Sequence, residues 1–306
     1  MILPAIAGIL AILAVIGRRN RRAMIAGLRQ RFSYSPDGVI RGAEPIRSVG
    51  STGAAVLLVH GGGDTPQTMH HLAAALSERG YGVVAPLLPG HGRNLDAFDA
   101  ADADAWYSAV EGEFRQLRAS NQWVGVVGLS MGGALSARLA AESGDVDALV
   151  LAAPYLSMPL GGALAARTAG AWGLLFPAVR TASELSVLDP EARAVSLGYG
   201  AFTSRSLRSL RRTAARGFAS LPRVTAPTLV IQSTTDNRVS TRSTARAFER
   251  IGAADKKLEW IEGAGHVITV DFGWQRVTRE ILEWMDSHRA NTTKGRRMSA
   301  PLSAEG

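Results

Sequence analysis

The segment from Gly128 to Gly133 reads GLSMGG and places one serine between two small residues. An apolar run, 123–129, precedes Ser130, and a segment of helical length, 131–143, follows it. A serine at such a sharp strand-to-helix turn projects its hydroxyl from the edge of a sheet. Because a serine hydroxyl is a weak nucleophile, it needs a base nearby. The pattern predicts that Ser130 is the nucleophile of a covalent mechanism.

The candidates for the base are the six histidines, at positions 60, 70, 71, 91, 266 and 288. After a nucleophile of this kind the acid and then the histidine follow along the chain, which leaves His266 and His288. His288 begins a polar tail and is typical of a solvated surface residue. His266 lies in a loop of small residues, EGAGH, after the last predicted strand. We therefore expect His266 to be the base.

The acid that orients the base should follow the preceding strand. Asp236 lies in the loop TTDN directly after the apolar run 227–232. Asp255 comes before the final strand, at the opposite end of the sheet, and Asp271 is five residues past His266, where it could be a capping residue. Asp236 is the predicted acid, which would fix the tautomer of the imidazole and stabilise its charged form.

Negative charge that develops on a tetrahedral intermediate needs preorganised donors. The N–H of Met131, next after the nucleophile, is one candidate. The second is the N–H of Gly62, in the side-chain-free loop HGGG that begins at His60 after the first core strand. His60 itself is expected to brace this loop.

Strand-like and helix-like segments alternate through the chain. The apolar runs lie at 54–60, 81–87, 123–129, 148–153, 227–232 and 257–261, and the helical patterns at 65–79, 104–119, 131–143, 241–251 and 274–287. This alternation predicts an α/β protein with a mostly parallel, doubly wound sheet. Residues 154–221 interrupt it with helical material, so we expect a small helical cap inserted between core strands.

These motifs resemble those of bacterial carboxylesterases and monoacylglycerol lipases over about residues 50–287. The segments that carry the resemblance are HGGG at 60–63, PGHG at 89–92, GLSMGG, the Asp236 loop and GHVITVD at 265–271. The resemblance implies the α/β-hydrolase fold, no cofactor, and hydrolysis of short- to medium-chain acyl esters or monoacylglycerol-like lipids. Gly62 departs from the bulkier residue that such esterases often have, which leaves the shape of the acyl pocket open.

Other functions are compatible with the same residues. A thioesterase, an acyltransferase or a peptidase would use the same triad, since one site on this fold supports many acyl-transfer reactions. A non-catalytic, membrane-tethered relative that only binds ligands is the alternative from another class.

The net charge of +8 comes from the two ends of the chain. Residues 1–31 contain six arginines and no acid, and the tail from residue 289 adds +3, so residues 32–288 are left at −1. A nucleic-acid-binding protein would have its positive charge on the folded domain, so no nucleic-acid partner is expected. The absence of cysteine excludes disulfides and thiolate metal sites. The basic tail, 288–306, is predicted to be disordered.

An uninterrupted apolar run of 16 residues, 2–17, opens the chain, and arginines follow it. A membrane-spanning helix needs about 20 residues, but flanking arginines can extend its reach. We expect a single N-terminal membrane anchor at 1–17, a basic juxtamembrane lead-in at 18–49 and a cytoplasmic catalytic domain at 50–287, because basic flanks stay inside.

Two charged clusters have plain structural explanations. Four acids between residues 96 and 104 resemble a metal site, but acids also favour helix N-termini. Four arginines at helical spacing, Arg205, Arg208, Arg212 and Arg216, fit the solvated face of an amphipathic helix. The alternative for this arginine stripe is contact with anionic lipid headgroups.

Overall fold

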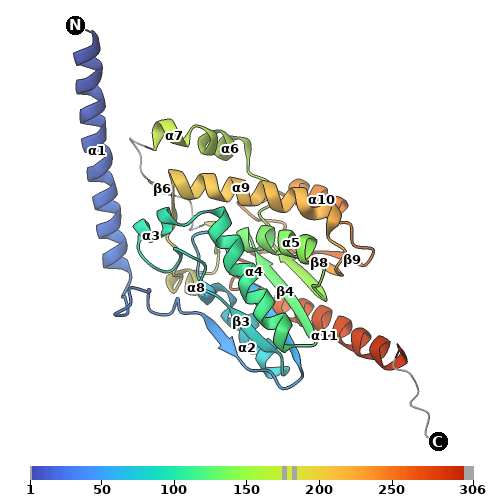
Figure 1. Cartoon of the computed structure of the whole chain (residues 1–306). Coiled ribbons are helices and arrows are strands. Elements are labelled where there is room, and N and C mark those ends of the chain that lie inside the picture. The colour runs from blue at the N-terminus through green and yellow to red at the C-terminus, as the bar shows by residue number, and fades with distance from the viewer. Residues whose placement is uncertain (1, 174–177, 181–184, 300–306) are drawn as a thin grey trace, which may run out of the picture.

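The computed structural model describes residues 2–173, 178–180 and 185–299, and its centre is a twisted sheet of seven strands (Figure 1). In spatial order the strands are β1 (Ile46–Ser48), β3 (Gly82–Ala85), β2 (Ala54–Val59), β4 (Trp123–Leu129), β5 (Ala148–Ala152), β8 (Thr228–Ser233) and β9 (Lys256–Ile261). Only β1 is antiparallel to its neighbour. The predicted mostly parallel sheet is confirmed.

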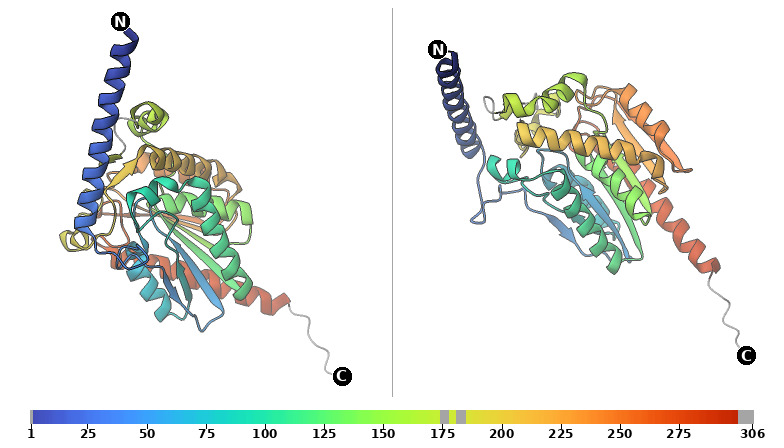
Figure 2. Two further views of the ribbon diagram at one scale, coloured as in Figure 1. Left: turned by 60° about the vertical axis from the view of Figure 1, so that its left-hand side comes forward. Right: turned by 45° about the horizontal axis from the view of Figure 1, so that its top comes forward.

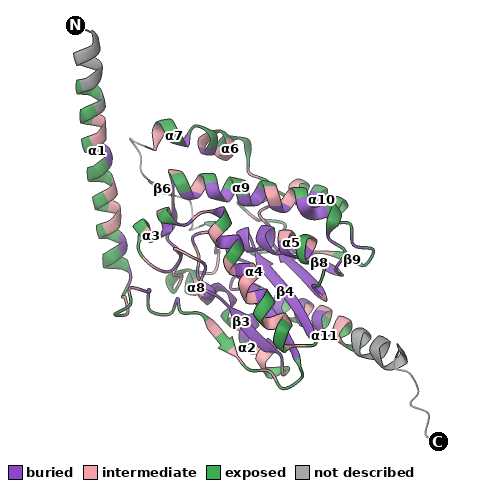
Figure 3. Ribbon diagram, viewed as in Figure 1, coloured by how far each residue is buried: buried purple, intermediate pink, exposed green. Residues whose placement is uncertain are grey.

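Helices cover both faces of the sheet. The 3₁₀ turn η1 (Pro66–Met69), α2 (His70–Glu78) and α11 (Trp274–Ser299) lie on one face, and α4 (Ala103–Ser120), α5 (Met131–Ser143) and α10 (Thr241–Arg250) on the other (Figure 1). The inner strands β3, β2, β4, β5 and β8 are therefore buried along their whole length, whereas the edge strands β1 and β9 are partly exposed. The outer faces of the helices are exposed (Figure 3).

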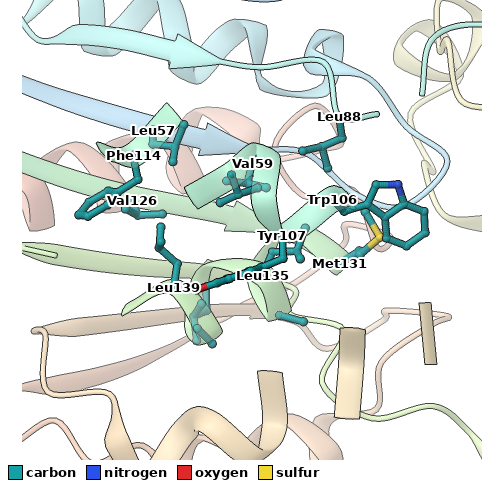
Figure 4. Packing of buried hydrophobic residues seen from close by; sticks show 14 of the residues in the cluster. Leu57, Val59, Leu88, Trp106, Tyr107, Phe114, Val126, Met131, Leu135 and Leu139 are labelled. Atoms are coloured by element: carbon teal, nitrogen blue, oxygen red, sulfur yellow. The ribbon is translucent and has the colours of Figure 1, made fainter. Parts of the chain in front are cut away.

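Alternation along β2 shows how the two cores are filled. Leu57 and Val59 pack beneath α4 and α5, together with Trp106 (Figure 4), while Val56 and Leu58 point to the α2 and α11 side. Successive side chains of a strand face opposite ways, so a sheet covered on both faces needs a continuous apolar run. The runs that form β2, β4 and β5 have this property.

The segment between β5 and β8 forms the expected insertion. It contains α6 (Leu160–Arg167), α7 (Ala169–Trp172), β6 (Ala178–Arg180), α8 (Pro190–Ala194), β7 (Ala201–Thr203), α9 (Ser204–Ser220) and the 3₁₀ turn η3 (Leu221–Arg223). The antiparallel pair β6–β7 was not predicted, because two strands of three residues give almost no periodic signal. Helix α9 crosses over α5 (Figure 2). Their close approach requires Gly217, where a Cβ would lie 2.6 Å from the Ala134 carbonyl oxygen.

The N-terminal run belongs to one long helix, α1 (Ile2–Arg31), which projects from the body (Figure 2). Among the described residues no helix combines the length and the apolar character that crossing a membrane requires. The predicted anchor is wrong on this finding, and so is the cytoplasmic placement that depended on it. The apolar run is short, and α1 continues through its arginines until Leu28 enters the core and Arg21 pairs with Asp96.

The acids between residues 96 and 104 serve helix ends and ion pairs. Asp102 caps α4 through the N–H groups of Asp104 and Ala105, and Asp96 belongs to a short helix, α3 (Leu95–Ala100). Asp104 pairs with Arg212 and Arg216 of α9, so half of the arginine stripe has partners within the chain. No cluster suited to a metal ion is found within the described ranges.

The C-terminal segment differs from expectation. Helix α11 extends to Ser299, where a disordered tail from residue 288 was expected, and residues 300–306 lie outside the described part. His288 lies within this helix with Nε2 2.9 Å from the Asp255 carboxylate, so it is not a freely solvated side chain.

Candidate active site

Ser130 occupies the sharp turn between β4 and α5 with φ 55° and ψ −116°. An L-residue in this region is strained, and such strain is frequent at functional sites. The turn needs glycine on both sides. A Cβ at Gly128 would lie 2.4 Å from the Gly132 carbonyl oxygen, and one at Gly132 would lie 2.0 Å from that of Val59. The sequence therefore bends here in a way that exposes the hydroxyl of Ser130 at the end of the strand.

Loops after three strands bring the predicted nucleophile, base and acid together. His266 Nε2 lies 2.7 Å from Ser130 Oγ, and His266 Nδ1 lies 2.7 Å from Asp236 Oδ2. Because an ionised carboxylate only accepts, the ring proton belongs on Nδ1, which leaves Nε2 to accept from the serine hydroxyl. His266 is buried, which protects these bonds from competition by water.

The Asp236 carboxylate is fixed by further donors. Burial alone raises its pKa, but the hydrogen bond from His266 and those from the Val239 and Arg238 backbone N–H groups hold the pKa below its ordinary value. Gln232 Nε2 also donates to Oδ2 at 2.7 Å. Asp236 is therefore charged and oriented at neutral pH. The competing acids lie elsewhere, since Asp255 pairs with His288.

Gly62 and Met131, the predicted oxyanion donors, are neighbours in space. A Cβ built on Gly62 would lie 3.2 Å from the Met131 sulfur, and Gly62 lines the cavity above Ser130. Met131 is the first residue of α5, where helix N–H groups have no partner within the helix. The two backbone segments thus lie next to each other beside Ser130.

His60 braces the loop that contains Gly62. Its Nδ1 lies 2.9 Å from the Gly61 carbonyl oxygen, and its Nε2 accepts the Leu88 N–H at 3.1 Å. Burial lowers the pKa of His60 to about 4, so the ring is neutral. The buried His91 packs edge-on against it with ring centroids 5.0 Å apart. Both histidines are structural in this arrangement.

A cavity of about 470 Å³ lies over Ser130 and His266, between the sheet edge and the insertion. Four charged residues that belong to none of the predicted site motifs also line the cavity, namely Arg31, Asp64, Arg193 and Arg238. Asp64 directly follows the HGGG loop, so its position in the sequence could have placed it near the site. The arginines have no such signal, because only the folding of distant segments brings them to the cavity.

Asp271 joins the His266 loop to the insertion. Its buried carboxylate accepts from four backbone N–H groups at 2.7–2.8 Å, those of Leu188, Asp189, Gly265 and Phe272. Next to it, the Val267 N–H donates to the Ser186 carbonyl oxygen. Asp271 is therefore a junction between the loop of the predicted base and the start of α8, and not part of the hydrogen-bonded chain to Ser130.

Residues 50–272 match the family described as Hydrolase_4, serine aminopeptidase S33. The chain belongs to this family. The match includes the elbow, the Asp236 loop, the His266 loop and the whole insertion, and it excludes α1. The match confirms the prediction that the chain is an α/β-hydrolase and a serine hydrolase.

Relatives of known name agree with the family. A thermostable monoacylglycerol lipase from a Bacillus species is 30% identical, over 82% of this chain and 97% of the lipase. A carboxylesterase from Bacillus subtilis is 25% identical, over 76% and 92% of the two chains. Among solved structures, one reported for the metagenome-derived lipolytic enzymes LipS and LipT superposes with a TM-score of 0.75 at 29% identity, over 82% of this chain and 100% of that one.

Proposed function

We propose that this hydrolase cleaves carboxylic esters through an acyl-enzyme on Ser130. One observation carries the proposal, namely the pair of 2.7 Å hydrogen bonds that links Ser130 Oγ, His266 and Asp236 at the floor of the cavity. The lipase and carboxylesterase names of the relatives support the ester class.

The steps follow from the positions of these groups. Ser130 Oγ attacks the ester carbonyl while His266 Nε2 takes the hydroxyl proton, and Asp236 stabilises the resulting imidazolium. The N–H groups of Gly62 and Met131 receive the oxyanion. His266 then protonates the departing alcohol, and a water molecule deprotonated by His266 releases the carboxylic acid and restores Ser130. Each step uses only groups of this chain and water.

The cavity supports a substrate of modest size. Pockets for small molecules usually measure about 300–1,000 Å³ and combine apolar walls with a few polar groups. The apolar part of the wall is formed by Leu207, Leu210 and Phe202, and Ser130 lines the same cavity. We infer short- to medium-chain acyl esters or monoacylglycerol-like lipids as the substrate class.

Hydrolysis of p-nitrophenyl esters from acetate to palmitate by the full chain tests this function. We expect a maximum at one chain length and a loss of kcat on the order of 10⁴-fold or more in Ser130→Ala. Ser136→Ala is a matched control, because it removes a buried hydroxyl from α5, the helix that follows Ser130, and Ser136 does not line the cavity.

A failure to hydrolyse these esters would have one of two meanings, which labelling of Ser130 distinguishes. If no ester is hydrolysed although a fluorophosphonate still labels Ser130, the ester class is rejected in favour of thioester or peptide substrates. If Ser130 is not labelled either, the catalytic mechanism itself is rejected.

A further inference from the structure

Arg31 reaches the catalytic cavity from outside the part of the chain that matches the family. It is the last residue of α1, 19 positions before the matched span begins at residue 50. The helix end is anchored, because Leu28 and Phe32 are buried in the core that packs under α4 and α5. Arg31 is therefore held at the cavity by residues that flank it on both sides.

Among the described residues no carboxylate pairs with the guanidinium of Arg31. Its Nη2 donates to the Ser196 carbonyl oxygen at 3.1 Å, and its Cζ lies 4.7 Å from the centroid of the Phe32 ring. No salt bridge to Arg31 is found in the described part of the chain. Partial burial lowers its pKa, although not enough to remove the charge. A guanidinium has five N–H donors, so most of its donor capacity is open to a ligand.

The other charged groups of the cavity leave it positive. Arg238 and Asp64 are close enough to influence one another, and Arg238 donates to the Ser186 hydroxyl at 2.9 Å. Arg193 also lines the cavity, and its guanidinium donates to the Val187 carbonyl oxygen. Among the described lining residues, Arg31 and Arg238 thus face the single carboxylate of Asp64. A cleft lined mainly by one sign of charge concentrates ligands of the opposite sign.

Distance along the wall separates Arg31 from the reacting atoms. Asp64 lies beside Ser130, since a Cβ on Gly61 would contact both residues. The segment that contains Ser196 and Gly198 comes next, because a Cβ on Gly198 would lie 2.7 Å from Asp64 Oδ1. Arg31 contacts this segment at Ser196. An anionic group bound at Arg31 would therefore be remote from the scissile bond and compatible with attack by Ser130.

We infer that the cavity selects esters that carry a second, anionic group, a carboxylate or a phosphate, and that Arg31 is the specificity-determining residue that binds it. The inference rests on the proposed ester hydrolysis and narrows its substrate class. The anionic oxygens accept hydrogen bonds from the guanidinium, and charge-assisted bonds of this kind are about twice as strong as neutral ones.

Two matched substrate pairs test the inference on the full chain. Mono-p-nitrophenyl glutarate against p-nitrophenyl pentanoate places the charge on the acyl side, and decanoylglycerol 3-phosphate against decanoylglycerol places it on the alcohol side. The readout is the ratio of kcat/KM for the anionic ester to that for its neutral partner. In at least one pair we expect Arg31→Gln to lower this ratio about tenfold, and Arg31→Lys to restore part of it.

Arg29→Gln is the matched control, because Arg29 lies on the same helix but not at the cavity. Its ratio should stay at the wild-type value. A purely structural role of Arg31, through Ser196, would change both members of a pair equally and leave the ratio unchanged, which would overturn the inference. A wild-type ratio more than tenfold below unity in both pairs would also overturn it. If none of the four esters is hydrolysed, the proposed function itself is rejected instead.

Discussion

Asp236 has a denser set of donors than any other group of the proposed triad. The His266 ring, the Gln232 amide and two backbone N–H groups converge on its two oxygens. An oriented, charged acid of this kind selects one tautomer of the base. We expect Asp236→Asn to lower kcat about 10⁴-fold, because the amide favours the wrong tautomer.

Steady-state kinetics on a hydrolysed ester measure this effect, and Asp255→Asn is the control. Asp255 is also an aspartate within hydrogen-bond distance of a histidine, His288, but it lies away from the cavity. A loss of less than tenfold in Asp236→Asn would contradict the assigned role.

Asp64 gives the site a pH dependence of stability. Desolvation raises the pKa of Asp64 to about 6, against the opposing influence of His266 and Arg238. Since the folded pKa lies above that of the unfolded chain, the folded state binds the proton more tightly. This contribution is full below the unfolded pKa and is lost as the pH rises through about 6.

Replacing Asp64 by asparagine removes the desolvated charge. We expect Asp64→Asn to have a larger free energy of unfolding than the wild type at pH 8, and this advantage to shrink toward pH 4. Urea denaturation of both proteins at pH 4, 6 and 8 measures it. A difference that does not change with pH would refute the assignment of the shift to Asp64.

At the scale of elements, Asp271 fixes the insertion to the His266 loop through the four N–H groups that it binds. An asparagine has one acceptor oxygen where the carboxylate has two, so Asp271→Asn leaves buried donors unpaired. Each such donor costs about 1–3 kcal/mol. We expect a loss of about 2 kcal/mol or more in unfolding free energy, together with a lower kcat, because the base loses its support.

Denaturant unfolding and ester kinetics on the same preparation check both effects. Glu262→Gln, on the exposed side of the same loop, should change neither. Stability equal to that of the wild type in Asp271→Asn would show that the junction does not depend on the charge.

The contact between α9 and α5 depends on a missing side chain. A Cβ at Gly217 would meet the backbone of Ala134, so Gly217→Ala should force the helices apart and cost about 1–3 kcal/mol. Gly112 of α4 has open space around its Cβ position, and Gly112→Ala should stabilise by about 0.5–1 kcal/mol. Thermal unfolding of the pair gives opposite shifts in Tm, and two shifts of the same sign would contradict the packing argument.

At the scale of the whole molecule, most of the sheet was predictable because its inner strands β2, β4 and β5 are continuous apolar runs between turn residues. β4 and α5 match their predicted bounds, 123–129 and 131–143, since the elbow at Ser130 marks both ends. The proximity of His266 and Asp236 to Ser130 was also expected from chain order. The cavity wall was not, because Arg31 and Arg238 come from segments with no common motif.

The N-terminal helix explains the largest error. Hydropathy scores a run of residues by itself, and by that measure 2–17 resembles a membrane segment. A hydropathy score takes no account of tertiary contacts. The same helix continues to Leu28, which is buried in the core, and Arg21 of this helix pairs with Asp96 of α3. The apolar run of 16 residues is shorter than a membrane-spanning helix needs, and the helix that contains it continues through arginines to contacts with the folded body.

The attachment of α1 has an evolutionary consequence. Its one residue at the cavity, Arg31, lies before the span that the family shares, and the proposed triad lies within that span. Mutation can therefore alter this wall while the reaction chemistry stays under separate selection. In this chain, a substitution ahead of the first core strand can thus change substrate preference with the proposed triad untouched.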